Sequence, residues 1–329
     1  MTTDEINQRA LSTLAPRSFT AERSTDTDAS RDEIAPTAAL IIPAHNEEAN
    51  IASLLECISS SPDFGSWRVI VVVNGSTDAT FSIARRYDGV IAVEIDEASK
   101  IAALNVGDRL AGEVFPRLYV DADVTFTAGT IEGLIAALRT DDAAVASPPS
   151  TVDTSASTWM VRAFYRALSL HPVVGAWRRE SMGWRRIYGA NAAARSRFAH
   201  WPALWNDDGF FESIFAPHEK NITEAGMVSS GAPRTLRGEI RRQLRIHRGN
   251  QQLDAFFEDS QMTRHRWRAE HHPLPLVTRL TKRAMTWTRL PLSSDFWRGG
   301  ALGMIVRALV MRIVRLRLRL LSTSEIAWG

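Results

Sequence analysis

The chain has 329 residues, of which 45% are hydrophobic and 23% charged, and it holds one cysteine, Cys57. This size and balance predict a globular protein and exclude wholesale disorder, while the lone cysteine excludes a disulfide framework and a multi-cysteine zinc module. The formal net charge is only +2, but residues 1–150 have a net charge of −12 and residues 151–329 one of +14. We therefore expect the second half to face something anionic.

No targeting or membrane-spanning segment is predicted. The N-terminal stretch carries Asp4 and Glu5 and no apolar run, which is unlike a signal peptide. The longest apolar stretch, 299–321, is interrupted by five arginines, which are unfavourable in a spanning helix. We expect a cytoplasmic protein, either free or peripheral at the inner face of the cell membrane.

Short apolar runs alternate with amphipathic stretches from residue 37 onward, after a polar stretch, 1–36, that we expect to be a flexible tail. Strands are predicted at 38–42, 67–73, 89–94, 118–120 and 143–147. Helices are predicted at 47–60, 76–87, 99–111 and 130–140. This alternation indicates an α/β fold with a mainly parallel sheet and helices on both faces.

The rhythm changes after residue 150. Helical spacing recurs at 157–169, 207–216 and 236–253. The stretch 171–190, rich in Trp, Arg and Gly, is interpreted as a loop. The main domain is expected at 37–255, followed by a basic, mostly helical C-terminal extension at 256–329.

Three polar clusters, at 43–48, 74–78 and 121–123, each follow a predicted strand. In parallel α/β sheets ligands bind outside the carboxyl ends of the strands, so we expect these clusters to line one crevice. Asp121 and Asp123 are two carboxylates that can jointly hold a hard divalent cation against a diphosphate. Taken alone, this Asp-x-Asp spacing is also typical of a solvated turn.

Several motifs, in the same order along the chain, resemble those of the family 2 glycosyltransferases of the GT-A fold. They are Ile41–Glu48, Val72–Asp78, the K-x-x-A-L-N-x-G helix Lys100–Gly107, the D-x-D signature in Tyr119–Asp123, a G-x-N loop at Tyr188–Asn191 and an acidic pair in Trp205–Asp208. The resemblance covers about residues 38–250, and the order of the motifs is more specific than any one of them.

The resemblance implies nucleotide-sugar binding by residues 37–150 and acceptor binding by residues 151–255. It implies that Asp123 and Asp121 bind Mg²⁺ or Mn²⁺, and that Asp208, next to Asp207, is the catalytic base. The donor-binding residues that it implies are Pro43, Ala44, Glu47, Asn74, Asp78, Lys100, Asp121, Gly189 and Asn191.

Structural interpretations compete with some of these roles. Glu47 and Asp78 each lie in the first turn of a predicted helix, where a carboxylate caps free N–H groups. Asp207 and Asp208 also begin a predicted helix, where two acids favour the helix dipole.

The chain departs from the family pattern at two places. Many members carry two aspartates before Gly-Ser in the second motif, whereas Val73 and Asn74 stand here. The donor base therefore stays open between uridine, guanosine and others. The Q-x-x-R-W motif of processive synthases is absent, since Gln243 is followed by Leu244, Arg245 and Ile246, and this favours a single-addition enzyme.

Two more candidates follow the acidic pair. Arg241, Arg245 and Arg248 share a helix face, and Arg245 is predicted to close over the donor phosphates, with a solvated basic face as the alternative. Some GT-A enzymes place a histidine ligand of the metal downstream of the base, which makes His218 a candidate against the alternative of a lone surface histidine.

The C-terminal stretch 304–321 combines apolar bulk with Arg312, Arg315 and Arg319 on one side of a predicted helix. This pattern suits an anionic membrane surface. The alternatives are packing on the protein with snorkelling arginines, or a homo-oligomer contact. Nucleic-acid binding is not expected, because the basic region contains no recognised module.

We therefore expect an inverting, metal-dependent glycosyltransferase that moves one sugar from a nucleotide-sugar donor to a hydroxyl or phosphate of a glycan or lipid-linked acceptor. A nucleotidyltransferase on a similar sheet is disfavoured, because Pro43–Asn46 stands where its Gly-rich loop would be. A non-catalytic nucleotide-sugar-binding protein on the same fold is the other alternative.

Overall fold

The computed structural model describes residues 35–140, 143–169, 181–182, 185–265 and 301–320. The expected flexible tail thus lies outside the described residues, apart from Ala35 and Pro36. Residues 266–300 of the expected extension lie outside them as well.

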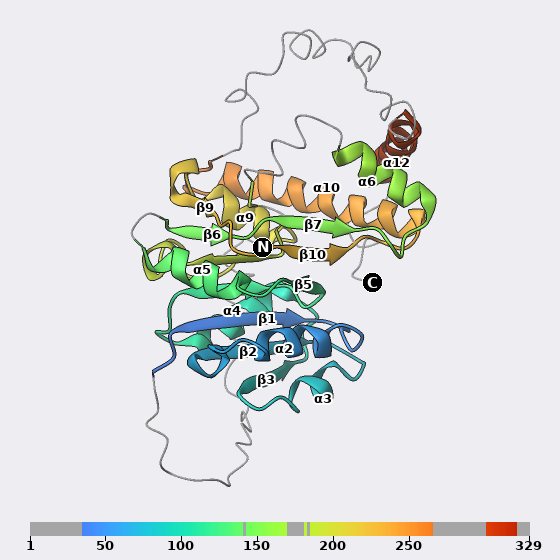
Figure 1. Ribbon diagram of the computed structural model, residues 1–329. Helices are drawn as coiled ribbons and strands as arrows, with labels where there is room; N and C mark the ends of the chain where they lie inside the picture. Colours follow the sequence, from blue (N-terminus) through green and yellow to red (C-terminus); the bar gives the residue numbers. More distant parts are fainter. Residues whose placement is uncertain (1–34, 141–142, 170–180, 183–184, 266–300, 321–329) are drawn as a thin grey trace. The chain divides into compact units, whose positions relative to one another are not determined.

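A seven-stranded sheet forms the centre of the fold (Figure 1). In spatial order its strands are β3 (Val90–Ile95), β2 (Trp67–Asn74), β1 (Ala38–Ala44), β4 (Arg117–Val120), β8 (Ile187–Ala190), β6 (Val145–Ser147) and β9 (Lys220–Ile222). Four neighbouring pairs are parallel, whereas β8 runs antiparallel to β4 and β6. The mainly parallel sheet is confirmed, but the interpretation of 171–190 as a loop is wrong over β8.

Helices of different length accompany the sheet in the described residues. They are α2 (Ile51–Ser59), α3 (Thr80–Ala84), α4 (Lys100–Ala111), α5 (Thr130–Arg139), α6 (Trp159–Ser169), α8 (Ala192–Arg195), α9 (Asp207–Ser213), α10 (Leu236–Asp259) and α12 (Ala301–Leu320), with 3-10 turns η1 (Phe64–Ser66) and η2 (Pro217–Glu219). A second sheet, which the sequence did not reveal, has the order β5 (Val124–Phe126), β10 (Val228–Gly231), β7 (Ser150–Asp153). Helix α10 continues past residue 255, the expected end of the main domain.

Helices cover both faces of the large sheet, as predicted. Alternate residues of β1 enter two separate cores, since Leu40 packs in the core that includes α2 and α5, and Ile41 in the core that includes α4 and α9. Helix α4 approaches the sheet closely at Gly107, where an added Cβ would lie 2.3 Å from Ile41 Cγ2. A glycine in this motif is thus explained by packing.

Strand β1 does not end before Pro43, contrary to the prediction. The Ala39 N–H donates to Pro116 O on the β4 side of the strand at 3.0 Å, and the nitrogen of Pro43, four residues on, faces the same side. Pairing between β1 and β4 ends at Ile41. The lack of an N–H at Pro43 therefore removes no hydrogen bond between β1 and β4.

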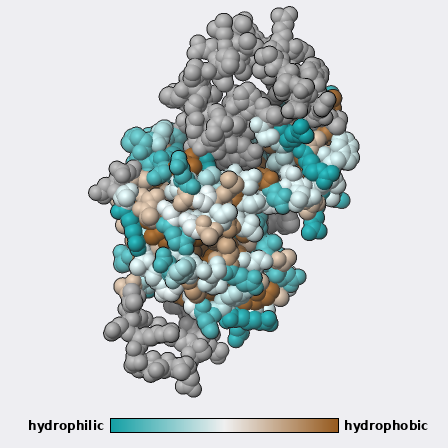
Figure 2. Space-filling model, viewed as in Figure 1, coloured by the Kyte–Doolittle hydropathy of each residue, from teal (hydrophilic) through white to brown (hydrophobic). Residues whose placement is uncertain are grey.

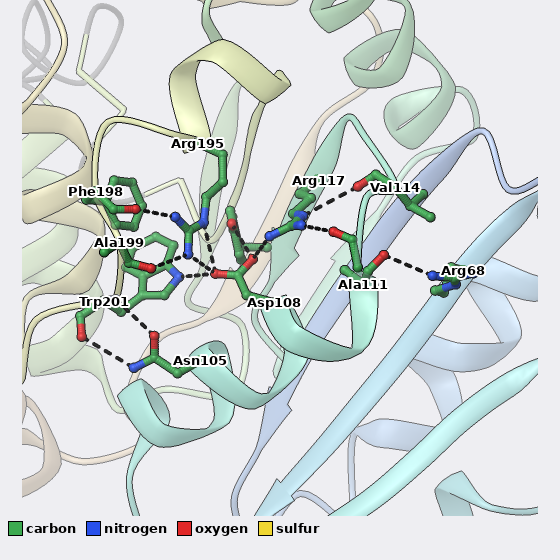
Figure 3. Close-up of polar contacts among 12 residues, drawn as sticks. Arg68, Asn105, Asp108, Ala111, Val114, Arg117, Arg195, Phe198, Ala199 and Trp201 are labelled. Atoms are coloured by element: carbon green, nitrogen blue, oxygen red, sulfur yellow. Dashed lines mark hydrogen bonds and ion pairs between the residues drawn. The ribbon is translucent and has the colours of Figure 1, made fainter. Parts of the chain in front are cut away.

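A buried carboxylate, Asp108, joins several elements at the end of α4 (Figure 3). Its Oδ1 accepts from Arg117 Nη1 at 2.8 Å and from Tyr119 Oη at 2.9 Å. Its Oδ2 accepts from Arg195 Nη2 at 2.7 Å and from Trp201 Nε1 at 2.8 Å. One aspartate thus ties α4 to β4, to α8 and to the segment that follows α8.

Helix α12 packs against α6 and α10 through its apolar side, with Val306, Val310 and Val314 buried in a third core. The helix predicted in the C-terminal stretch is confirmed as α12. The side of α12 that carries the three buried valines packs on the protein, as one of the alternatives proposed. No helix within the described part of the chain combines the length and apolar character that crossing a bilayer requires. On the face drawn in Figure 2, hydrophilic and apolar areas are interspersed among the coloured residues.

Candidate active site

The carboxyl end of β4 carries the two aspartates of the predicted metal site. Asp121 is held on both sides, because Oδ1 lies 2.7 Å from Lys100 Nζ and Oδ2 lies 3.1 Å from Arg186 Nη1. Burial alone would raise the pKa of Asp121, but these two cations outweigh it and lower the pKa to about 2. Asp123 is more open, with 39% of its side chain exposed, and its Oδ1 lies 3.9 Å from Arg186 Nη1.

Lys100 links this end of β4 to the acidic pair of α9. It is the first residue of α4, after Ser99, whose hydroxyl caps the helix by accepting from Ala102 N at 3.2 Å. Its ammonium lies 2.7 Å from Asp121 Oδ1 and 2.8 Å from Asp207 Oδ2. Burial would lower the pKa of Lys100, but these carboxylates raise it above its ordinary value, so the group stays a cation.

The two residues of the acidic pair differ in their surroundings. Asp207 is buried, and its Oδ2 accepts from Tyr188 Oη at 2.8 Å in addition to the ion pair with Lys100. Asp208 is half-buried, and its Oδ1 accepts from the neighbouring Gly209 N–H at 2.9 Å. Burial, with the negative charges of Asp207 and Asp121, raises the pKa of Asp208 to about 7. Asp208 is therefore suited to exchange a proton near neutral pH.

Arg186 is a site residue that the sequence analysis missed. It precedes β8, and its backbone carbonyl accepts from the Asp121 N–H at 2.9 Å while its guanidinium reaches both Asp121 and Asp123. Its neighbour Arg185 is buried elsewhere, donating to Ser181 O and Pro148 O. Nothing in the sequence distinguishes these adjacent arginines, because the antiparallel pairing of β8 with β4 decides which one reaches the site.

The first two polar clusters meet, as predicted. The Glu48 N–H donates to Asp78 Oδ2 at 3.0 Å and the Glu47 N–H to Thr80 Oγ1 at 2.7 Å. Burial raises the pKa of Glu47, and so do the charges of Asp123 and Asp121, which puts Glu47 within electrostatic reach of the third cluster. The Oδ1 of Asp78 also accepts from the Thr80 N–H at 3.0 Å, so its carboxylate satisfies a free N–H group at the start of α3, although the N-cap position itself is Ala79.

Three more of the predicted donor-binding residues lie at the ends of β1 and β2. Pro43 and Ala44 are buried at the end of β1. The Asn74 side chain is also buried, and in the amide orientation that satisfies its neighbours it donates to Ala44 O at 3.0 Å and accepts from Ser99 N at 3.3 Å. The structure thus gives Asn74 a role in joining β1, β2 and α4.

The expectation of a G-x-N loop at Tyr188–Asn191 is wrong over β8, and Asn191 does not lie beside Asp121. Gly189 is inside β8, paired with Leu118, and a Cβ there would lie 2.4 Å from Leu118 Cδ2. Because β8 is antiparallel to β4, Asn191 follows at the opposite end of β4 from Asp121. There it caps α8 by accepting from Ala194 N at 2.8 Å. The geometry supports packing and capping for these residues, and no donor contact.

His218 is also remote from the two aspartates. It is exposed in η2, just before β9, and β9 is an edge strand separated from β4 by β8 and β6. Its partner strand β6 pairs Val145 with both Lys220 and Ala190, so His218 lies toward the end of the sheet opposite Asp121. The prediction of His218 as a ligand of the same metal is not supported, and a surface histidine is what the structure shows.

Arg245 lies on α10 within electrostatic reach of the site. Removal from water, together with the positive charges of Arg186 and Arg242, lowers the pKa of Arg245, while the charges of Asp121 and Asp123 act in the opposite direction. Arg245 therefore lies near enough to the two aspartates for the predicted contact with a donor phosphate.

The described residues contain no group of three or more His, Cys, Asp or Glu side chains arranged to hold a metal ion. A dedicated protein cage is not required, because Mg²⁺ is commonly held by one or two carboxylates together with substrate phosphates and water. The exposed carboxylate of Asp123 beside Asp121 fits that pattern.

Comparison with known proteins identifies the chain. Residues 39–202 match the profile of glycosyl transferase family 2. The chain belongs to this family. It is 32% identical over 116 residues to the low-salt glycan biosynthesis hexosyltransferase Agl6 of Haloferax volcanii, a match that covers 35% of the chain and 27% of Agl6. The matched part thus spans about a quarter of that relative.

Among solved structures, this family 2 protein is similar to the mannosyltransferase PcManGT from Pyrobaculum calidifontis in complex with GDP-Man and Mn²⁺. The TM-score is 0.55 at 18% sequence identity, over 96% of this chain and 94% of that one. This likeness extends over nearly the whole of both chains and shows the fold.

Proposed function

We propose that this family 2 protein is an inverting, metal-dependent glycosyltransferase that moves one sugar from a nucleotide-sugar donor to a hydroxyl or phosphate of a glycan or lipid-linked acceptor. The observation that carries the proposal is Lys100, whose ammonium lies 2.7 Å from Asp121 Oδ1 and 2.8 Å from Asp207 Oδ2 and so joins the predicted metal site to the acidic pair, where the pKa of Asp208 is raised to about 7. A proton acceptor and a cation site for a diphosphate are the two parts that such a transfer requires.

Asp208 is the general base of the proposed reaction. With a pKa of about 7, it is substantially ionised at neutral pH and still basic enough to accept a proton from a hydroxyl as the oxygen attacks. The acceptor oxygen attacks the anomeric carbon from the face opposite the nucleotide, so the configuration inverts. Asp207 acts through Asp208, because its fixed negative charge helps to keep that pKa high.

Asp123 and Asp121 would hold the divalent cation, and Glu47 and Lys100 lie close to them. When bound, such a cation neutralises the negative charge that develops on the leaving nucleoside diphosphate. The similar mannosyltransferase is described with GDP-Man and Mn²⁺, and a nucleotide-sugar with Mg²⁺ or Mn²⁺ is what we propose for this chain.

The exposed side of α12 supports an acceptor at an anionic membrane surface. Ile305, Leu309 and Leu316 are 66%, 51% and 51% exposed, while the opposite side of the helix is buried. Exposed arginines accompany them on α12, at Arg312, Arg315 and Arg317. Apolar residues with basic neighbours favour the interface of an anionic leaflet. This arrangement would keep the enzyme peripheral to the membrane and close to a lipid-linked acceptor.

The metal and donor proposal is tested by calorimetry with Asp123→Ala. We expect wild-type protein to bind UDP or GDP in the presence of Mn²⁺, and Asp123→Ala to lose this metal-dependent binding while remaining folded, because the side chain is largely outside the cores. Asp63→Ala is the matched control, since Asp63 is an exposed aspartate before the amino end of β2. Undiminished Mn²⁺-dependent binding by Asp123→Ala would contradict the assignment.

A further inference from the structure

The guanidinium of Arg186 lies close to the carboxylates of Asp121 and Asp123. Its Nη1 is 3.1 Å from Asp121 Oδ2 and 3.9 Å from Asp123 Oδ1. Both aspartates belong to the site proposed for the divalent ion, and the negative charge of Asp208 also acts on Arg186. Arg186 therefore already neutralises part of the charge that a metal ion would neutralise.

The backbone of Arg186 is held in an unusual conformation. Its φ is +63°, in the left-handed region that is unfavourable for residues other than glycine. The hydrogen bond from Asp121 N to Arg186 O, 2.9 Å long, fixes this backbone against the aspartate that the side chain also contacts. Such conformations persist where the surrounding structure demands them, and they cluster at functional sites.

A further cation is close by. The charge of Arg186 contributes to the lowered pKa of Arg245, and Arg242 contributes as well. The charges of Asp121 and Asp123 offset part of the repulsion between these arginines, and they would do so less once a divalent cation binds the two carboxylates. A diphosphate is an anion that several guanidinium groups can share through parallel hydrogen bonds.

We propose that Arg186 exchanges partners during donor binding: without ligand it neutralises Asp121 and Asp123, and when the divalent ion takes those carboxylates its guanidinium binds the diphosphate of the donor, beside Arg245. This rests on the proposed function. Arg186 then competes with the metal ion for the carboxylates of Asp121 and Asp123, and it contributes to nucleotide binding once the metal is present. The positive charge of Arg186 thus stays near the leaving group, while its partner changes from the two carboxylates to the diphosphate.

The exchange predicts that Arg186→Asn raises the affinity for Mn²⁺ alone and lowers the affinity for a nucleoside diphosphate. Asparagine tolerates the left-handed backbone, so the fold is retained. Affinity for Mn²⁺ alone, followed by electron paramagnetic resonance, should rise by about threefold because a competing charge is gone. Affinity for UDP or GDP at saturating Mn²⁺, measured by calorimetry, should fall by about tenfold or more because a charge-assisted hydrogen bond is lost.

Two variants complete the experiment. Arg186→Lys keeps the charge, so its affinity for Mn²⁺ alone should stay near that of wild type, while its affinity for the diphosphate falls less than in Arg186→Asn. Arg109→Asn is the control for the loss of one positive charge, since Arg109 is exposed at the far end of the helix that Lys100 begins. It should match wild type in both measurements.

The outcomes separate this proposal from the one on which it rests. If wild-type protein binds neither Mn²⁺ nor a nucleoside diphosphate, the proposed function is wrong and the exchange with it. If wild type binds both and Arg186→Asn weakens both together, Arg186 only supports the structure and the exchange is wrong. Unchanged affinities in Arg186→Asn overturn it as well.

Discussion

The side chain of Asp208 is the residue on which proton transfer depends in our proposal. Asp208→Asn has nearly the same shape but cannot accept a proton at neutral pH, so we expect kcat to fall by ~10²-fold or more. Affinity for the nucleotide should change little, because the base acts on the acceptor. In wild type, kcat/KM for a hydroxyl acceptor should rise with pH up to about 7 and then level off, following the pKa of Asp208. Steady-state kinetics across pH test both statements.

The same raised pKa predicts an opposite effect of Asp208→Asn on stability. Between about pH 4 and pH 7 the folded protein keeps a proton on Asp208 that the unfolded chain has released, so this group makes the fold less stable as pH rises through that range. An amide carries no such charge. In ligand-free protein the melting temperature of Asp208→Asn should be close to wild type at pH 4 and higher than wild type at pH 8. Equal melting temperatures at pH 8 would show that the ionised form of Asp208 does not destabilise the fold.

Asp207 should act as a positioning residue. Its negative charge contributes to the raised pKa of Asp208, so Asp207→Asn should move the midpoint of the kcat/KM profile to lower pH. It should also destabilise the fold, because Asp207 accepts from Tyr188 and pairs with Lys100. If Asp207→Asn abolishes turnover while Asp208→Asn retains it, the base is Asp207. If both variants keep their turnover, the catalytic role of the pair is wrong.

At the scale of elements, the Asp108 cluster links α4, β4 and α8. Arg117 and Arg195 are both buried and share this one carboxylate. Asp108→Asn would leave two buried guanidinium groups without their counter-charge, and breaking a buried pair in this way costs about 3–5 kcal/mol. We expect urea denaturation to show a fall of this size in the free energy of unfolding.

The control for this prediction is Asp63→Asn, which changes an exposed aspartate and should leave the free energy of unfolding within about 0.5 kcal/mol of wild type. Asp108 lies two turns along α4 from Lys100, so nucleotide binding by folded Asp108→Asn protein should be unaffected. A variant as stable as wild type would mean that the arginines find other partners or water.

For the whole molecule, the uneven distribution of charge and the exposed side of α12 predict reversible binding to anionic vesicles. Each basic residue near an anionic leaflet contributes about 1 kcal/mol, and Ile305, Leu309 and Leu316 add apolar area. In co-sedimentation, binding should increase with anionic lipid and decrease as salt screens the charges. The double variant Leu309→Asp with Leu316→Asp should bind much less than wild type.

Met227→Asp is the matched control, since Met227 is a comparably exposed apolar residue, 46% exposed, away from α12. It should bind vesicles like wild type. If wild type does not sediment with anionic vesicles at low salt, membrane attachment is wrong. The exposed side of α12 would then be examined as a contact between copies of the chain by measuring the oligomeric state of the same variants.

Much of the fold could be predicted because its signals are local. Apolar runs of period two and helical stretches alternate through residue 147, and alternation with short connections leaves a mainly parallel sheet as the simple solution. The carboxyl ends of parallel strands lie at one edge, which is why Glu47, Asp78 and Asp121 could be expected near one another. The order of the motifs along the chain likewise indicates the family without any geometry.

Only the tertiary structure decided the contacts between distant segments. The antiparallel direction of β8 brings Arg186 to Asp121 and takes Asn191 to the other end of the sheet, and no local period encodes that direction. The raised pKa of Asp208 likewise depends on burial and on charges distant in sequence, Asp121 among them. Residue types and spacing by themselves determined which chemistry is available, whereas packing decided which side chains meet and in which protonation state, because desolvation and Coulomb interactions depend on distance in space.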